Sequence, residues 1–204
     1  MFTGLIREMA TVQGYQNNEL RVKADYQPKI GDSIAINGAC LTVIKLFADG
    51  FSVELSPETQ TNIVTENLRG KVHMEPAMQM GERFEGHIVQ GHVDCIGEIN
   101  KIHDNGNSFD FFITVNEEYR RFLIPKGSVT VDGVSLTINE ITQDGFRLTI
   151  IPHTMKESLF GIYGVGHKLN IETDMFARYI FHLFNPDKKQ SLSWDDIDKI
   201  SSLY

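Results

Sequence analysis

Apolar and polar residues alternate in short runs that end at turn-forming pairs over most of the chain. Residues 33–43 place Ile34 and Ile36 at period two and then reach the pair Asn37-Gly38. Period two puts alternate side chains on one strand face, and an Asn-Gly pair favours a two-residue hairpin. Similar runs predict further strands at residues 20–24, 51–55, 109–115 and 168–173. The pattern therefore predicts an all-β body of short strands joined by tight turns.

This pattern occurs twice along the chain. INGACLTV at residues 36–43 returns as VDGVSLTI at 131–138, and the offset of 95 residues also relates the two copies of Asp-Gly-Phe at 49–51 and 144–146. A period this long exceeds the roughly 20–45 residues of a solenoid repeat. The repetition therefore indicates two copies of one domain. Each copy has the size expected of a small Greek-key barrel.

The C-terminal region has a different pattern. Its apolar side chains recur at helical spacing, at Met175, Phe176, Tyr179, Ile180, Leu183 and Phe184. Asn185-Pro186 predicts the end of this helix, and Ser193 is suited to cap a second one. Neither helix has a counterpart in the first copy. Residues 175–204 are therefore predicted to serve oligomerisation, or alternatively to cover one end of a barrel.

Composition excludes several classes of partner. The 204 residues are 41% hydrophobic and 23% charged, with a net charge of −8 and no basic patch, which argues against nucleic acid. We find no apolar run of the roughly 18 residues that a membrane helix needs, and no signal-peptide pattern. The two cysteines, Cys40 and Cys95, are too few for a disulfide framework and lack metal-ligand spacing. A cytoplasmic protein without a membrane partner is expected.

Polar side chains follow both predicted hairpin turns. Cys40 and Thr42 lie at alternate positions after the first turn, as Ser135 and Thr137 do after the second. Alternate residues share a strand face, so each pair could hydrogen-bond a flat polar heterocycle. One pair alone is more simply interpreted as structural polarity beside a turn. Because the pair is duplicated, we predict two equivalent small-molecule sites.

The segment EGHIVQGHVD, residues 85–94, adds two histidines. His87 and His92 would point to opposite faces of a strand, which argues against a shared metal. Either could act as an acid or base, although a surface histidine is the commoner interpretation of each. Lys126 could neutralise an anion or could be an exposed turn lysine. Backbone groups around Pro57 and Pro152 could pair with a ligand's imide edge, as strand edges do.

Taken together, MFTGLI, NGACLTV, DGVSLTI, GHIVQGHVD and IPHT resemble the riboflavin synthase family over residues 1–175. The resemblance implies barrels of six strands each, at residues 1–86 and 87–174, and a homotrimer assembled through the C-terminal segment. It implies that two molecules of 6,7-dimethyl-8-ribityllumazine dismutate to riboflavin and 5-amino-6-(D-ribitylamino)uracil, without metal or cofactor. A non-catalytic lumazine- or flavin-binding fluorescent protein shares this fold and is the alternative.

The resemblance also implies the site residues, with each active site between the N-terminal barrel of one subunit and the C-terminal barrel of a neighbour. Substrate contacts assigned to the N-terminal barrel are Gly4, Leu5, Ile6, Cys40, Leu41, Thr42, Glu54, Leu55, Ser56, Pro57, Glu58 and Thr59. Those assigned to the C-terminal barrel are Gly91, His92, Val93, Lys126, Ser135, Leu136, Thr137, Thr149, Ile150, Ile151, Pro152, His153 and Thr154. His92 is the leading candidate for proton transfer, with Cys40 and Ser135 as further catalytic candidates.

Overall fold

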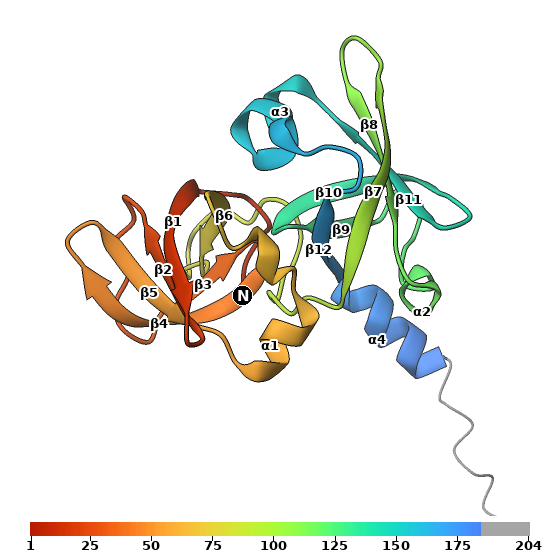
Figure 1. Ribbon diagram of the computed structural model, residues 1–204. Helices are drawn as coiled ribbons and strands as arrows, with labels where there is room; N and C mark the ends of the chain where they lie inside the picture. The colour runs from red at the N-terminus through yellow and green to blue at the C-terminus, as the bar shows by residue number, and fades with distance from the viewer. Residues whose placement is uncertain (185–204) are drawn as a thin grey trace, which may run out of the picture.

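The computed structural model describes residues 1–184 and contains two β-barrels side by side (Figure 1). The first is built from β1 (Glu8–Gln16), β2 (Glu19–Lys23), β3 (Ser33–Ile36), β4 (Ala39–Phe47), β5 (Gly50–Glu54) and β6 (Lys71–Pro76). The second is built from β7 (Cys95–Asp104), β8 (Phe109–Thr114), β9 (Ser128–Val131), β10 (Val134–Ile141), β11 (Gly145–Ile150) and β12 (Lys168–Thr173).

Both barrels are closed, and they share one topology. The strand order is β1-β2-β5-β4-β3-β6 in the first barrel and β10-β11-β8-β7-β12-β9 in the second, which is the same order when β7 is matched to β1. The predicted fold class of duplicated six-stranded barrels is therefore confirmed. The predicted domain boundary between residues 86 and 87 falls in the segment joining β6 to β7 and stays a prediction.

The hairpin turns explain why the duplicated motif folds the same way twice. Asn37 and Gly38 have φ of 44° and 81°, and Asp132 and Gly133 have φ of 45° and 84°. Two successive positive φ angles define the type I′ turn, whose twist matches that of the flanking strands. Beyond each turn, alternate side chains fill a separate apolar core in each barrel, with Phe51 fully buried in the first and Phe146 in the second.

Short helices stand where the sequence suggested extended backbone around the two prolines. α1 (Pro57–Asn62) and α3 (Pro152–Glu157) begin at these equivalent prolines. Ser56 caps α1, because its hydroxyl accepts a hydrogen bond from the Thr59 amide at 3.0 Å. Proline suits the first helical turn because it has no N–H to leave unpaired. The backbone beyond each proline is therefore helical and not extended, and the pairing of these backbone groups with a ligand stays a prediction.

The remaining helices lie around the second barrel and the junction between barrels. They are the 3₁₀ helices η1 (Thr65–Asn67) and η2 (Leu159–Ile162), and the α-helices α2 (Glu117–Arg120) and α4 (Met175–Phe184). The predicted helix at residues 175–184 is confirmed in full. The predicted stop at Asn185-Pro186 and the cap at Ser193 lie outside the described residues. Within residues 1–184, no helix combines the length and apolarity needed to cross a membrane.

Candidate active site

Two short segments cross between the barrels and lie side by side at their junction. Phe2, which precedes the first barrel, pairs with Val89, which precedes the second. The Phe2 amide donates to the Val89 carbonyl at 2.7 Å, and the Val89 amide donates to the Phe2 carbonyl at 3.0 Å. Both side chains are buried, Phe2 fully and Val89 to 1% exposure. This paired core fixes where the residues after Phe2 and Val89 can lie.

Each barrel has one strand that carries the polar pair, here called the polar strand: β4 with Cys40 and Thr42, and β10 with Ser135 and Thr137. Each crossing segment lies against the polar strand of the other copy's barrel. The Gly4 carbonyl accepts a hydrogen bond from the Ser135 amide at 2.8 Å, and the Gly91 carbonyl accepts one from the Cys40 amide at 2.8 Å. The expected grouping is therefore wrong. Gly4 and its neighbours belong with the second barrel, and Gly91 and its neighbours belong with the first.

Glycine is required where each segment meets its strand. Gly91 has φ of +78°, and a Cβ placed on it would lie 2.6 Å from the Cys40 Cβ. Gly4 has φ of +78° too, and its Cβ would lie 2.5 Å from the Ser135 Cβ. A side chain there would meet both backbone strain and a clash.

Gly91→Ala is expected to lower the free energy of unfolding by about 1–3 kcal/mol, the cost of a forced left-handed residue. Gly14→Ala is the matched control, because a methyl group on Gly14 would meet no other atom within 4 Å and the residue has no left-handed φ. Its effect should stay within about 0.5 kcal/mol. Urea denaturation of both variants measures the difference, and equal midpoints would contradict the proposed close contact.

The first candidate half-site, here called the first half-site, is a cavity of about 490 Å³ between the first barrel and the segment that begins at Gly91. Its lining includes seven residues that the sequence predicts as substrate contacts: Cys40, Ser56, Glu58, Thr59, Gly91, His92 and Val93. Cys40 is half-buried and Thr42 is exposed, on the outward face of β4. His92 thus lies with Cys40, and not with Lys126 as the sequence suggested.

The second candidate half-site, here called the second half-site, brings Ser135 against His87, which the sequence alone presents more simply as a surface histidine. His87 Nδ1 lies 2.7 Å from the Ser135 hydroxyl, and His87 Nε2 lies 3.3 Å from the Thr130 hydroxyl. Burial lowers the pKa of His87, which favours the neutral imidazole. The available signal was the repeated pair Gly86-His87 and Gly91-His92. A neutral histidine bonded to a hydroxyl is an arrangement suited to proton transfer.

Several predicted contacts can offer only backbone atoms. Leu41, Leu55 and Ile150 are 1–3% exposed because their side chains fill the barrel cores. The Thr149 hydroxyl donates to Asp110 at 2.6 Å, so it is already occupied.

The other predicted substrate contacts are partly buried or exposed. Ile6 and Leu136 pack on the second core, whereas Leu5 and Thr154 are half-buried. The exposed members are Glu54, Pro57, Lys126, Thr137, Ile151, Pro152 and His153.

Two buried glutamates, which sequence reasoning missed, hold the crossing segments. Glu75 accepts hydrogen bonds from the Thr3 amide at 2.7 Å, the Thr3 hydroxyl at 2.9 Å and the Gly4 amide at 3.0 Å. Glu172 accepts hydrogen bonds from three backbone N–H groups of the segment that contains Gly91. Burial raises the pKa of Glu172 to about 7, against the lowering effect of its amide donors.

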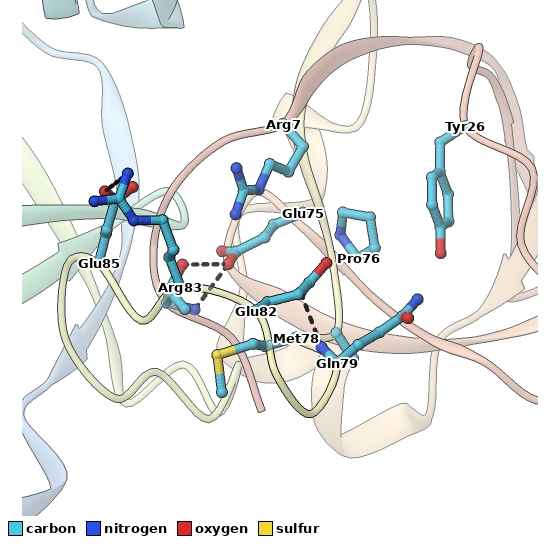
Figure 2. Close-up of a pocket in the computed structure, with 11 residues that line it drawn as sticks. Arg7, Tyr26, Glu75, Pro76, Met78, Gln79, Glu82, Arg83 and Glu85 are labelled. Atoms are coloured by element: carbon cyan, nitrogen blue, oxygen red, sulfur yellow. Dashed lines mark hydrogen bonds and ion pairs between the residues drawn. The ribbon is translucent and has the colours of Figure 1, made fainter.

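A further cavity of about 520 Å³ lies beside Glu75 in the first copy. Figure 2 shows Arg7 pointing toward Glu75, with Tyr26 and Arg83 elsewhere around the cavity. No residue predicted as a substrate contact lines it.

Comparison with known proteins gives a duplicated match. The family described as "Lumazine binding domain" matches residues 3–77 and again residues 90–174. The riboflavin synthase of Photobacterium phosphoreum is 42% identical over 213 aligned positions, which cover 98% of each chain. The riboflavin synthase of Bacillus subtilis (strain 168) is 38% identical, covering 93% of this chain and 94% of that one.

Solved structures share the fold. LumP complexed with riboflavin superposes with a TM-score of 0.75 at 17% identity, covering 85% of this chain and 100% of that chain. LumP complexed with 6,7-dimethyl-8-(1'-D-ribityl) lumazine gives a TM-score of 0.71 at 19% identity, covering 85% and 99%. The duplicated match, together with full-length similarity to curated enzymes, shows that the chain belongs to the riboflavin synthase family, whose lumazine-binding domain it contains twice.

Proposed function

We propose that the chain catalyses a dismutation of 6,7-dimethyl-8-ribityllumazine, the last step of riboflavin biosynthesis. One molecule passes a four-carbon unit to a second, which gives riboflavin and 5-amino-6-(D-ribitylamino)uracil. The observation that carries this proposal is the pair of equivalent half-sites, each formed by a polar strand and a crossing segment. A reaction between two copies of one substrate can use two copies of one binding domain.

The chemistry of the half-sites supports this reaction. A methyl group on the lumazine ring is acidic because its anion spreads over the heterocycle, so catalysis needs a proton acceptor and an anion stabiliser. His92 lines the first half-site beside Cys40, and the His87–Ser135 pair lies in the second. Lys126 is a candidate to neutralise the anion. We assign the first proton transfer to His92, with Cys40 and Ser135 as further catalytic candidates.

Two lumazines must also be held face to face, and we propose that a second chain is needed for this. The residues lining the first half-site include none of Ser135, Leu136 or Thr137 from the second. Pairing the first half-site of one subunit with the second half-site of its neighbour brings the rings together. Holding two reactants in register can supply about 7–11 kcal/mol of the barrier. We propose a homotrimer, as the family resemblance implies.

The outer face of α4 is the proposed assembly surface, because its apolar side chains are 53–80% exposed at Phe176, Tyr179, Ile180, Leu183 and Phe184. Tyr179→Asp with Leu183→Asp is expected to reduce the mass in solution from trimer to monomer. Ile162→Asp with Val165→Asp is the matched control, since these apolar residues are 78% and 66% exposed outside α4. Light scattering measures the mass. A trimer that survives the α4 substitutions would contradict this assignment.

The direct test is to incubate the purified protein with the lumazine alone. We expect riboflavin to form, with two lumazines consumed for each riboflavin. A non-catalytic lumazine- or flavin-binding protein is the second candidate, favoured by the fold shared with LumP. That candidate predicts stoichiometric binding without turnover, which would overturn the enzymatic proposal.

A further inference from the structure

The loop that carries His92, here called the His92 loop (residues 90–94), is held by one carboxylate. Glu172 accepts hydrogen bonds from the amides of Gln90 at 2.7 Å, Gly91 at 2.8 Å and His92 at 3.1 Å. Glu172 is only 3% exposed. Charge-assisted hydrogen bonds are stronger than neutral ones, so this carboxylate fixes the loop best when ionised. The position of His92 therefore depends on what surrounds Glu172.

The first copy holds its crossing segment with a different set of charged side chains. Glu75 holds the first crossing segment there. Burial raises the pKa of its carboxyl, and Arg7, which faces it (Figure 2), opposes part of that rise together with the Thr3 and Gly4 donors. Asp94 stands in the place of Arg7 in the second copy. The Arg7 amide donates to the Met74 carbonyl at 3.0 Å, and the Asp94 amide donates to the Ile171 carbonyl at 2.8 Å. A cation in one copy is thus an anion in the other.

Arg178 of α4 supplies the positive charge that the second copy's loop lacks. Its Nη1 donates to Asp94 Oδ1 at 2.6 Å, and its Nη2 donates to the Gln90 side-chain oxygen at 2.8 Å. The other Asp94 oxygen accepts from the amide and the hydroxyl of Thr173, each at 2.7 Å. The Arg178 side chain is 25% exposed and that of Asp94 only 10%, so solvent screens the pair less than it screens a surface ion pair.

We propose that Arg178 is a positioning residue that couples α4 to the His92 loop. The inference rests on the proposed function, because it takes His92 as part of the reacting site. The first copy has no helix in the corresponding place among the described residues, and a cavity lies beside Glu75 instead (Figure 2). The helix whose outer face is proposed to join subunits therefore also sets the loop geometry.

The test compares Arg178→Met with Arg120→Met in the full-length protein. Arg120 is a matched control, because its side chain is 29% exposed, it belongs to the same barrel and its ion pair is with Glu117 instead of the loop. We expect Arg178→Met to lower kcat roughly ten- to hundredfold, as displacements of about 1 Å can do. Arg120→Met should stay within about twofold, and both variants should keep the wild-type mass. Arg178→Lys should restore part of kcat because it keeps the charge.

The pH profile separates positioning from a general loss of structure. Burial is the main cause that raises the pKa of Glu172. Of the charged groups that face this carboxyl, Asp94 raises its pKa further and Arg178 lowers it. Removing Arg178 should raise that pKa further, so the loop weakens at a higher pH. The acid limb of the kcat profile should therefore move to higher pH in Arg178→Met and should not move in Arg120→Met.

Amide hydrogen exchange provides a readout that does not require turnover. Arg178→Met should speed exchange at the amides of Gln90, Gly91 and His92 without changing exchange in the barrel strands. Inactivity of the wild-type protein would overturn the proposed function and leave this readout intact. Unchanged exchange at these three amides, or equal kcat in Arg178→Met and Arg120→Met, would overturn the role of Arg178.

Discussion

His92→Leu is expected to lower turnover roughly 10²- to 10⁴-fold, the usual contribution of a general acid or base. Leucine is the informative replacement, because Leu5 occupies the equivalent position in the other crossing segment: each follows the glycine that lies on a polar strand. The variant gives both segments the same residue and removes the imidazole beside Cys40 from the first half-site. Steady-state kinetics with the lumazine measure kcat and KM separately.

The expected loss should fall on kcat more than on binding. Fluorescence titration of the bound lumazine should show a change of about tenfold or less, because Ser56, Glu58 and Thr59 still line the cavity. Leu5→Ala is the comparison at the equivalent position and should alter KM without a comparable fall in kcat. If His92→Leu keeps turnover within a few-fold of wild type, proton transfer belongs to Cys40 or to the His87–Ser135 pair.

The repeated strands and the C-terminal helix were predictable from sequence because each carries its own periodic signal. Isoleucines at period two and an Asn-Gly pair specify the β3–β4 hairpin locally, and helical spacing specifies α4 over residues 175–184. The offset of 95 residues then implied equivalent barrels. These elements depend on short-range preferences that a single sequence displays directly.

The crossing segments could not be predicted in this way. Around Phe2 and Val89 the two copies share little more than the glycine that follows, so periodicity has nothing to detect. Their exchange between barrels depends on contacts such as Gly4 with Ser135, which are far apart in sequence. The role of His87 could not be predicted for the same reason, because nothing local in the sequence shows that it meets a hydroxyl 48 residues away.

The junction between barrels also contains a matched pair of buried side chains, His73 on β6 and Asn170 on β12. The Asn170 Nδ2 donates to the Asn37 carbonyl at 2.8 Å, and its Oδ1 accepts from the Val64 amide at 2.8 Å. Asn170 is 2% exposed and His73 is fully buried. An amide side chain suits this place because it offers both a donor and an acceptor.

His73 makes the same pair of bonds with the second copy. Its Nδ1 lies 2.8 Å from the Asp132 carbonyl oxygen, and its Nε2 accepts from the Leu159 amide at 2.8 Å. A carbonyl can only accept and an amide N–H can only donate, so the two partners together require a neutral ring with the proton on Nδ1. Burial, partly opposed by the Asp132 carbonyl, lowers the pKa of His73 to about 4.

His73→Leu is expected to lower the free energy of unfolding by about 2–6 kcal/mol, because it leaves a buried N–H and a buried carbonyl unpaired at about 1–3 kcal/mol each. His73→Asn should cost less, because Asn170 shows that an amide can make both bonds in the equivalent place. Urea denaturation at pH 7.5 measures both variants. If both variants lose the same free energy of unfolding, the two hydrogen bonds are not the source of the stability that His73 provides.

The stability difference between wild type and His73→Asn should also depend on pH. The pKa of His73 is about 4 in the folded chain against an ordinary value of 6.5, so the unfolded chain binds the proton first as pH falls. The free energy of unfolding that neutral His73 contributes is therefore complete above about pH 6.5. It falls by about 3 kcal/mol as the pH is lowered toward 4. Asp132 and Glu172, whose pKa values burial raises to about 7, titrate in both proteins and largely cancel in the difference.

Urea denaturation at pH 7.5 and again near pH 4.5 should therefore show that the stability advantage of wild type over His73→Asn shrinks by about 2–3 kcal/mol. A difference that stays constant between the two pH values would mean that the folded protein does not hold His73 neutral.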